Sequence, residues 1–274
     1  KLRRRNIATY VVSAIFRPDS VFFRPWGGAW RKALGTFNKL FVQNDESREL
    51  LASIGYTNVV VAGDTRFDRV AAIAKSAKRI ELIERFKGDD RLFVAGSTWA
   101  PDEELLIELA NDNPTIRFVI APHEMDAARI EHLISAIKGG AVRYTHIDDS
   151  TDLRSAQVLI LDTVGILSSV YGYATWSYIG GGFGVGIHNT LEAATFGLPI
   201  AFGPNYHKFK EARDMIALGA ACSVSSSAEL KAWFEPLRDN DEHLQATGSA
   251  AREYTAKNLG ATELILKGMG YGTK

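Results

Sequence analysis

The sequence contains a single cysteine, Cys222, among its 274 residues, so no disulfide bond can form within the chain. Such scarcity of cysteine is typical of proteins from a reducing compartment. No stretch reaches the roughly 18 consecutive apolar residues that a membrane-spanning helix requires. The apolar run IATYVVSAIF, residues 7–16, is much shorter, and its β-branched residues predict a buried strand.

Charge of one sign is not in excess over the chain as a whole. The 32 basic and 32 acidic side chains balance, which argues against general binding to nucleic acid. The first 48 residues nevertheless contain ten Lys or Arg and three Asp or Glu, whereas the remainder contains 22 and 29. One end of the chain is therefore basic and the rest mildly acidic. The hydrophobic content of 46% is sufficient for a well-buried core.

The start of the chain shows no signal peptide, because no apolar segment with a small-residue cleavage site follows its basic residues. It begins at Lys1 and not at a methionine. We expect the chain to be a fragment or a processed form of a longer protein.

Short β-branched runs alternate with helical patterns along the chain. The runs that we predict as strands, several of them continuing into a loop, are 7–12, 39–43, 58–63, 91–98, 116–124, 158–165, 175–182 and 198–204. A long helix is predicted from about residue 69 to 86, one helix over 189–197, and four more over about 208–218, 227–237, 240–257 and 260–267. This alternation implies parallel strands joined by right-handed crossovers. The predicted fold class is therefore α/β, with a doubly wound parallel sheet.

We predict three segments. Residues 69–250 form a nucleotide-binding, Rossmann-like domain with the doubly wound sheet. Residues 1–68 read as the closing part of another α/β domain, and they are too short to be stable alone. Residues 251–274 are expected to form a C-terminal helix that packs back on the N-terminal part.

Polar or glycine-rich sequence follows five of the predicted strands. The five segments are AGST (95–98), APHE (121–124), LDTVG (161–165), GGGFGVGIHN (180–189) and FGPNYHKF (202–209). Ligands of open parallel sheets bind at the carboxyl ends of the strands. We therefore expect these segments to meet at one edge of the sheet and to form a ligand site.

The stretch from Gly180 to Gly186 holds five glycines and leads into a predicted helix that begins near His188 or Asn189. Glycine lets the backbone approach a ligand closely, and the free N–H groups of a helix start favour an anion such as phosphate. Glu192 lies one turn inside that helix, where its carboxylate can accept hydrogen bonds from adjacent ribose hydroxyls. The alternative is a tight strand-to-helix turn with an ordinary exposed glutamate.

The other strand ends supply further candidates. Ser97 and Thr98 could bind a phosphate or a sugar acid, or they could cap the helix that Pro101 opens. Lys208 could pair with an anion. Each isolated histidine could equally be a polar loop residue or a helix cap. The histidines are scattered without the paired spacing of a metal site, and neither a dinucleotide-binding fingerprint nor a Walker-type lysine is present.

Seven motifs resemble the 3-deoxy-D-manno-octulosonic acid (Kdo) transferases of lipopolysaccharide synthesis. They are FVQNDES (41–47), VAGDTRFDRV (61–70), AGSTWAPDEE (95–104), IAPHE (120–124), LDTVGILSSVYGYATWSYIGGGF (161–183), GIHNTLEAATFGLPIAFGPNYHKF (186–209) and NLGATELIL (258–266). Their order and spacing cover nearly the whole chain. Two departures stand out: the family's extra arginine before His123 is missing, where Arg129 is a possible substitute, and Val164 replaces a common methionine.

The resemblance implies a GT-B-type fold and transfer of Kdo from CMP-Kdo to the lipid A precursor, with inversion and without a metal or other cofactor. It implies that this chain is the carboxyl-terminal, donor-binding half with the end of the acceptor half. The general base is expected in the absent upstream half, so we expect weak binding of CMP or CMP-Kdo and no transfer by this chain unaided. The expected location is the cytoplasmic face of the bacterial inner membrane.

The resemblance and the motifs together assign a role to each candidate residue. The amides of Asn189 and Thr190, with Ser97 and Thr98, are expected to bind the CMP phosphate or the Kdo carboxylate, and Glu192 the ribose. His123, Asp162 and Gly165 are expected to flank the cytosine. Gly182, Gly186 and His188 of the glycine-rich segment are also expected to bind the substrate. Arg66 and Lys208 are further candidates for anionic groups, and Arg66 has an interdomain salt bridge as its alternative.

The segment FFRPWGGAWRK, residues 22–32, interleaves aromatic and basic side chains. It could contact anionic lipid headgroups or the acceptor's phosphates, or it could be a packed helix whose aromatic residues belong to the core.

Two other functions stay open for the whole chain. One is another nucleotide-sugar enzyme of the GT-B type, including a UDP-sugar epimerase, and the other is a non-catalytic nucleotide-binding module.

Overall fold

The computed structural model describes residue 2 and residues 5–272, which form two compact units. The first unit combines the chain up to Arg69 with the chain from Ala256 onward, and the second unit is Val70–Thr255. The chain thus returns to the first unit at Ala256, compared with the predicted residue 251.

The first unit contains a three-stranded parallel sheet in the order β1 (Tyr10–Ala14), β2 (Lys39–Val42), β3 (Val59–Val61). Its helices are η2 (Val21–Phe23), α1 (Gly28–Leu34), α2 (Asp45–Ser53), the start of α3 (Thr65–Lys75) and α12 (Ala261–Gly268). Leu40 belongs to the same core cluster as residues of α1 and α2, whereas Phe41 packs with Ile265 of α12. The side chains of β2 therefore alternate between two cores.

The second unit contains a seven-stranded sheet in which all strands are parallel. The order is β10 (Ala221–Ser223), β9 (Ile200–Phe202), β8 (Trp176–Ile179), β4 (Leu92–Thr98), β5 (Arg117–Pro122), β7 (Val158–Ile160), β6 (Ala141–Arg143). From β4 the chain forms β5, crosses to the edge strand β6, and returns to form β7 between β5 and β6. It then continues on the other side of β4 with β8, β9 and β10. The predicted α/β class with a doubly wound parallel sheet is confirmed.

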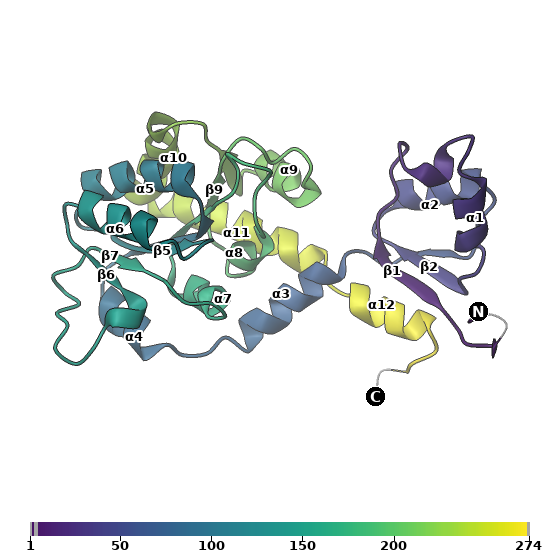
Figure 1. Cartoon of the computed structure of the whole chain (residues 1–274), viewed down its shortest axis with the longest axis horizontal. Coiled ribbons are helices and arrows are strands. Elements are labelled where there is room, and N and C mark those ends of the chain that lie inside the picture. Colours follow the sequence, from purple (N-terminus) through teal and green to yellow (C-terminus); the bar gives the residue numbers. More distant parts are fainter. Residues whose placement is uncertain (1, 3–4, 273–274) are drawn as a thin grey trace. The chain divides into compact units, whose positions relative to one another are not determined.

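Helices cover both faces of this sheet. They are α4 (Glu81–Lys87), α5 (Ala100–Asp112), α6 (Ala127–Ala136), η3 (Tyr144–His146), α7 (Leu167–Val170), η4 (Tyr171–Tyr173), α8 (Leu191–Thr195), α9 (Lys210–Ala217), α10 (Ser227–Asp239) and α11 (Asp241–Lys257). Figure 1 shows α5 and α6 on one side of β5–β7 and α4 on the other. Val94 and Val119 face the core that includes α4, while Phe93 and Phe118 face the core that includes α5.

The predicted long helix over 69–86 is wrong, because α3 ends at Lys75 and α4 begins at Glu81. In the intervening segment, the backbone N–H of Lys78 donates to Ser169 Oγ at 3.3 Å and that of Ile80 to Tyr173 Oη at 2.7 Å. Partners far away in the sequence thus replace helical hydrogen bonds there. The three-residue edge strands β6 and β10 were not predicted.

Candidate functional site

The site lies where the chain changes direction across the sheet. Strands β4 and β8 are neighbours, but their connections lead to opposite sides of the sheet. At such a switch point the two loops that follow the strands diverge and leave a crevice, which is where open α/β sheets bind ligands. Here the crevice lies between the end of β4 with the following Trp99 and the loop 180–190 after β8, which correspond to two of the five predicted segments.

Asp102 joins these two loops. It lies at the third position of α5 and its side chain is fully buried. Its carboxylate accepts hydrogen bonds from the backbone N–H of Trp99 (2.9 Å), the backbone N–H of Gly181 (2.9 Å) and the hydroxyl of Tyr178 (2.7 Å). Burial raises the pKa of Asp102, and its hydrogen bonds act in the opposite direction. One carboxylate therefore sets the spacing of the loops after β4 and β8.

A pocket of about 390 Å³ opens between the loops. Its wall consists mostly of aromatic and imidazole rings and glycine backbone, and its lining residues are Trp99, Pro101, His123, Gly181, Phe183, Gly184, Val185, Gly186 and His188. The pocket brings together three residues of the predicted site, His123, Gly186 and His188. Among the described residues, no Asp, Glu, Lys or Arg lines this pocket.

Three rings form a stack in this pocket. The ring of His123 lies 4.9 Å from that of Trp99 and 4.4 Å from that of His188, measured between centroids. The Nε1–H of Trp99 donates to Nε2 of His188 at 3.3 Å. Burial lowers the pKa of His188, the nearby His123 lowers it further, and Asp102 raises it.

Close packing explains why glycine occupies several positions of the loop after β8. A Cβ on Gly180 would come within 2.2 Å of the Ser97 carbonyl oxygen, and one on Gly182 within 2.5 Å of the Gly203 Cα. Gly181 has a φ of +92°, and the His188 ring lies close above it. Gly182 therefore allows the backbone of this loop to lie against that of Gly203, and it does not line the pocket.

The predicted anion site of free amides is only partly present. The N–H of Gly181 donates to Asp102, that of Gly184 to the Gly181 carbonyl, and that of His188 to the Gly180 carbonyl. Helix α8 begins at Leu191, later than predicted, and it is only five residues long. Its Leu191 N–H donates to the side chain of Asn189 at 3.2 Å.

Glu192 is half-buried and held by two side chains. Its Oε1 accepts from Asn189 Nδ2 at 3.0 Å, and its Oε2 accepts from Ser168 Oγ of α7 at 2.6 Å. Glu192 does not line the pocket, but its bond to Ser168 places it beside the chain that follows β7. The neighbouring Thr190 is buried, and its hydroxyl has no hydrogen-bond partner in the described residues.

Ser97 and Thr98 have different environments. Ser97 has a φ of +55° at an irregularity in the β4–β5 pairing, a strained conformation for a residue with a side chain. The Thr98 hydroxyl is buried and donates to Glu103 at 2.8 Å, so the assignment of this hydroxyl to a ligand is not supported. Neither residue caps α5, whose N-cap is Trp99.

The buried pair of Glu103 and Arg129 lies behind the same loop. Arg129 Nε is 3.0 Å from Glu103 Oε2, and the guanidinium lies 6.0 Å from the Trp99 ring centre. Arg129 is therefore next to the pocket wall, but its charge is paired.

Asp162, which was assigned to the cytosine side, is already hydrogen-bonded within the second unit. Its side chain is 2% exposed, and it accepts hydrogen bonds from Arg143 Nε and Thr145 N, both at 2.9 Å. Burial opposes ionisation, but these bonds and the Arg143 charge hold the pKa of Asp162 below its usual value. Gly165 is exposed, with a φ of +90°, and lines a separate cavity of about 510 Å³.

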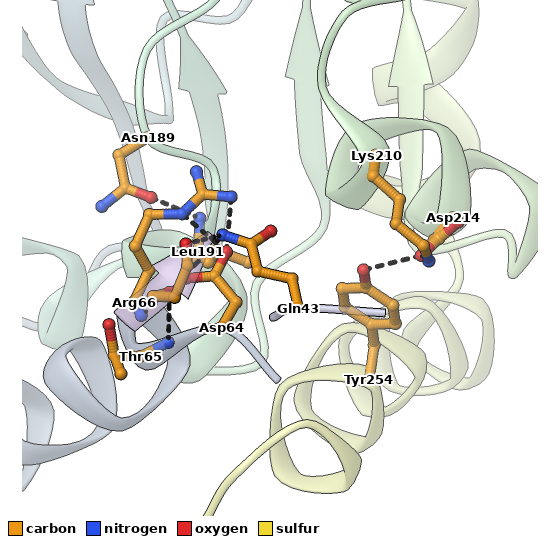
Figure 2. A network of polar contacts seen from close by, with 10 residues as sticks. Gln43, Asp64, Thr65, Arg66, Asn189, Leu191, Lys210, Asp214 and Tyr254 are labelled. Atoms are coloured by element: carbon orange, nitrogen blue, oxygen red, sulfur yellow. Dashed lines mark hydrogen bonds and ion pairs between the residues drawn. The ribbon is translucent and has the colours of Figure 1, made fainter. Parts of the chain in front are cut away.

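The two remaining candidates lie outside the pocket lining. Lys208 is exposed in the turn before α9. Arg66 belongs to the first unit, where its Nε donates to Asp64 Oδ2 at 2.8 Å (Figure 2). Ser13 joins the same network, because its hydroxyl donates to Asp64 and its carbonyl accepts from Gln43. Arg66 thus pairs with a carboxylate two residues away in its own unit.

Sequence reasoning missed Trp99, Asp102, Tyr178 and Ser168. The signal for Asp102 was present, because an acidic residue at the third position of a helix that opens with proline is typical of a capping box. No local pattern indicated that this carboxylate also reaches β8.

In the described part of the chain, no cluster of three or more His, Cys, Asp or Glu could hold a metal ion. No helix formed by the described residues is long and apolar enough to span a membrane.

Known proteins resemble the chain in sequence. Residues 1–69 match a family model described as 3-deoxy-D-manno-octulosonic-acid transferase (kdotransferase). A 3-deoxy-D-manno-octulosonic acid transferase of Bordetella pertussis is 30% identical over 283 residues, covering 96% of this chain and 64% of that protein. One of Haemophilus influenzae is 24% identical over 236 residues, covering 82% of this chain and 54% of that protein. The chain therefore spans less than two thirds of either relative.

Solved structures resemble the chain in fold. The C-terminal CMP-Kdo binding domain of WaaA from Acinetobacter baumannii has a TM-score of 0.51 at 19% identity, covering 70% of this chain and 97% of that domain. A putative UDP-N-acetylglucosamine 2-epimerase from Listeria monocytogenes has a TM-score of 0.67 at 16% identity, covering 99% of this chain and 71% of that protein. Identities this low show a shared α/β fold of the GT-B type and no more. The family model and the relatives confirm that this chain resembles the 3-deoxy-D-manno-octulosonic acid transferases.

Proposed function

We propose that this chain is the donor-binding part of a glycosyltransferase that transfers Kdo from CMP-Kdo to a lipid A precursor, with inversion and without a metal. The similarity to Kdo transferases over 96% of the chain supports the reaction. The structural observation that carries the proposal is the arrangement at the β4–β8 switch point. There a ring-lined pocket opens beside the glycine-rich loop, and Asn189 and Ser168 hold the Glu192 carboxylate just beyond that loop.

Such a reaction makes two demands on the protein. Negative charge that develops on the leaving phosphate must be stabilised, and the acceptor hydroxyl must lose its proton. We assign the first demand to the pocket, with His123 and His188 as the polar groups nearest to the donor. Glu192 is assigned to the ribose, because each of its oxygens makes one hydrogen bond and keeps a lone pair for a sugar hydroxyl. The general base is proposed to lie outside this chain.

A panel of nucleotides tests the proposal. CMP is expected to raise the melting temperature of the chain more than UMP, UDP or GDP does, because a ligand that binds the folded state stabilises it. A shift with UDP alone would favour a UDP-sugar enzyme, an alternative that the fold similarity to a UDP-N-acetylglucosamine 2-epimerase leaves open. If no nucleotide changes the melting temperature, a non-catalytic module is the better description.

We also propose that an anionic bilayer, at the cytoplasmic face of the inner membrane, is a partner of the first unit. The aromatic residues of 22–32 divide into two groups. Phe22 and Phe23 pack against the core of the first unit, as expected if their role is in packing and not in membrane contact. Trp26 and Trp30, however, are 71% and 55% exposed, and Arg24 and Lys32 beside them are exposed as well. Exposed tryptophans among basic residues are typical of a membrane interface.

A further inference from the structure

We propose that Trp99 is a positioning residue that holds His188 in one neutral tautomer, so that the Nδ1–H of His188 can donate to an anionic oxygen of the bound ligand. The inference rests on the proposed function for the nature of that ligand. The oxygen can belong to a phosphate or to the carboxylate of a sugar acid, which share this chemistry.

The tautomer follows from the Trp99–His188 contact. An indole N–H can only donate, so the nitrogen that faces it must offer a lone pair. Nε2 of His188 lies 3.3 Å from Nε1 of Trp99 and is the acceptor. In a neutral imidazole the proton must then be on Nδ1. Burial and the neighbouring His123 both lower the pKa of His188, which favours the neutral ring that this bond requires.

The ring's orientation follows from Gly181. A Cβ built on Gly181 would lie 2.9 Å from Cδ2 and 3.2 Å from Nε2 of His188, so this edge of the ring rests on the glycine. Nδ1 belongs to the opposite edge of the ring. It has no hydrogen-bond partner within the described part of the chain, and His188 lines the pocket.

The charged groups around the ring are compatible with a neutral His188. From α5, the buried Asp102 is the nearest carboxylate, and it is already bonded to three donors. From the loop after β5, His123 stacks on the ring. From α6, Arg129 lies over Trp99 and is paired with Glu103. Within the residues that the structure describes, no carboxylate is hydrogen-bonded to Nδ1, so a ligand oxygen can accept its proton.

Nuclear magnetic resonance of ¹⁵N-labelled protein tests the first step without any ligand. His188 is expected to carry its proton on Nδ1 at pH 7.5, and Trp99→Phe, which keeps an aromatic ring beside His123, is expected to remove this preference. A proton on Nε2 in the unsubstituted protein, or an unchanged tautomer in Trp99→Phe, would overturn the proposal. If the variant does not fold, the spectrum of the unsubstituted protein still decides.

Titration calorimetry with CMP and with free Kdo tests the second step and separates the phosphate from the carboxylate. Trp99→Phe is expected to weaken one of the two ligands by roughly 2- to 10-fold, the loss expected for one hydrogen bond. His188→Asn keeps an N–H donor near the Nδ1 position and is expected to restore affinity in the Trp99→Phe background, whereas His188→Gln is not. Unchanged affinity for both ligands in Trp99→Phe would overturn the proposal. If the unsubstituted protein binds neither ligand, the proposed function fails as well, while the tautomer remains separately measurable.

Discussion

Glu192 is the predicted site residue whose environment best suits ligand binding. Among the described residues no basic side chain pairs with its carboxylate, which is only half-buried. Asn189 and Ser168 fix the direction of the carboxylate. A carboxylate that is oriented but not neutralised can still accept hydrogen bonds from a ligand. Thr98 and Asp162 differ from it, because Glu103 and Arg143 already use their polar atoms.

Glu192→Ala is expected to weaken CMP binding at least tenfold, about 1.4 kcal/mol, because two ribose hydroxyls lose a common charged acceptor. Isothermal titration calorimetry measures the change. Glu242→Ala, which removes an exposed carboxylate in the first turn of α11, is the matched control and should leave the affinity unchanged. An unaltered affinity in Glu192→Ala would remove this residue from the proposed site.

The glycine-rich loop is the element on which the site depends, and its glycines differ in what they do. The Gly182 backbone lies against that of Gly203, so two loops at the carboxyl edge of the sheet touch directly. Gly184 is exposed, has no positive φ, and has its nearest obstruction 3.6 Å from a built Cβ. Within one loop, therefore, one glycine is required by packing and another is not.

Gly182→Ala is expected to lower the free energy of unfolding by about 1–3 kcal/mol, because the added methyl group meets backbone atoms that have no alternative rotamer. Gly184→Ala should change it by no more than about 0.5 kcal/mol. Urea denaturation of both variants measures the difference. Equal effects at the two positions would show that the contact between Gly182 and Gly203 does not constrain the loop.

We propose different partners for the two units of the molecule. The second unit contains the pocket and a sheet covered on both faces. The first unit contains the basic end of the sequence and the exposed Trp26 and Trp30. On this proposal the second unit binds a polar ligand and the first unit contacts lipid headgroups.

Replacing Trp26 and Trp30 together by alanine is expected to reduce sedimentation with vesicles that contain anionic lipid by more than fivefold, because interfacial anchoring scales with the aromatic and apolar area inserted. Leu218→Ala removes a side chain in the second unit that is 55% exposed, and it serves as the control. Binding of the unsubstituted chain should also fall as salt is added, since basic side chains contribute. Equal sedimentation of all variants would contradict the proposed membrane contact.

The sequence by itself determined the α/β class, most of the strands and the edge of the sheet at which the site lies. These features depend on local periodicity and on the rule that parallel strands present their carboxyl ends together. Three of the residues predicted to lie together, His123, Gly186 and His188, line one pocket, because each follows a strand of the same sheet.

Only the tertiary structure decided which polar atoms are free for a ligand. Asp102 resembled an ordinary capping residue, yet it joins two loops through Gly181 and Tyr178, far away in the sequence. The helix predicted over 69–86 breaks where the hydroxyls of Ser169 and Tyr173, far away in the sequence, accept hydrogen bonds from its backbone N–H groups. A hydrogen bond between distant segments leaves no trace in local sequence periodicity, so such partners become visible only when the chain is folded.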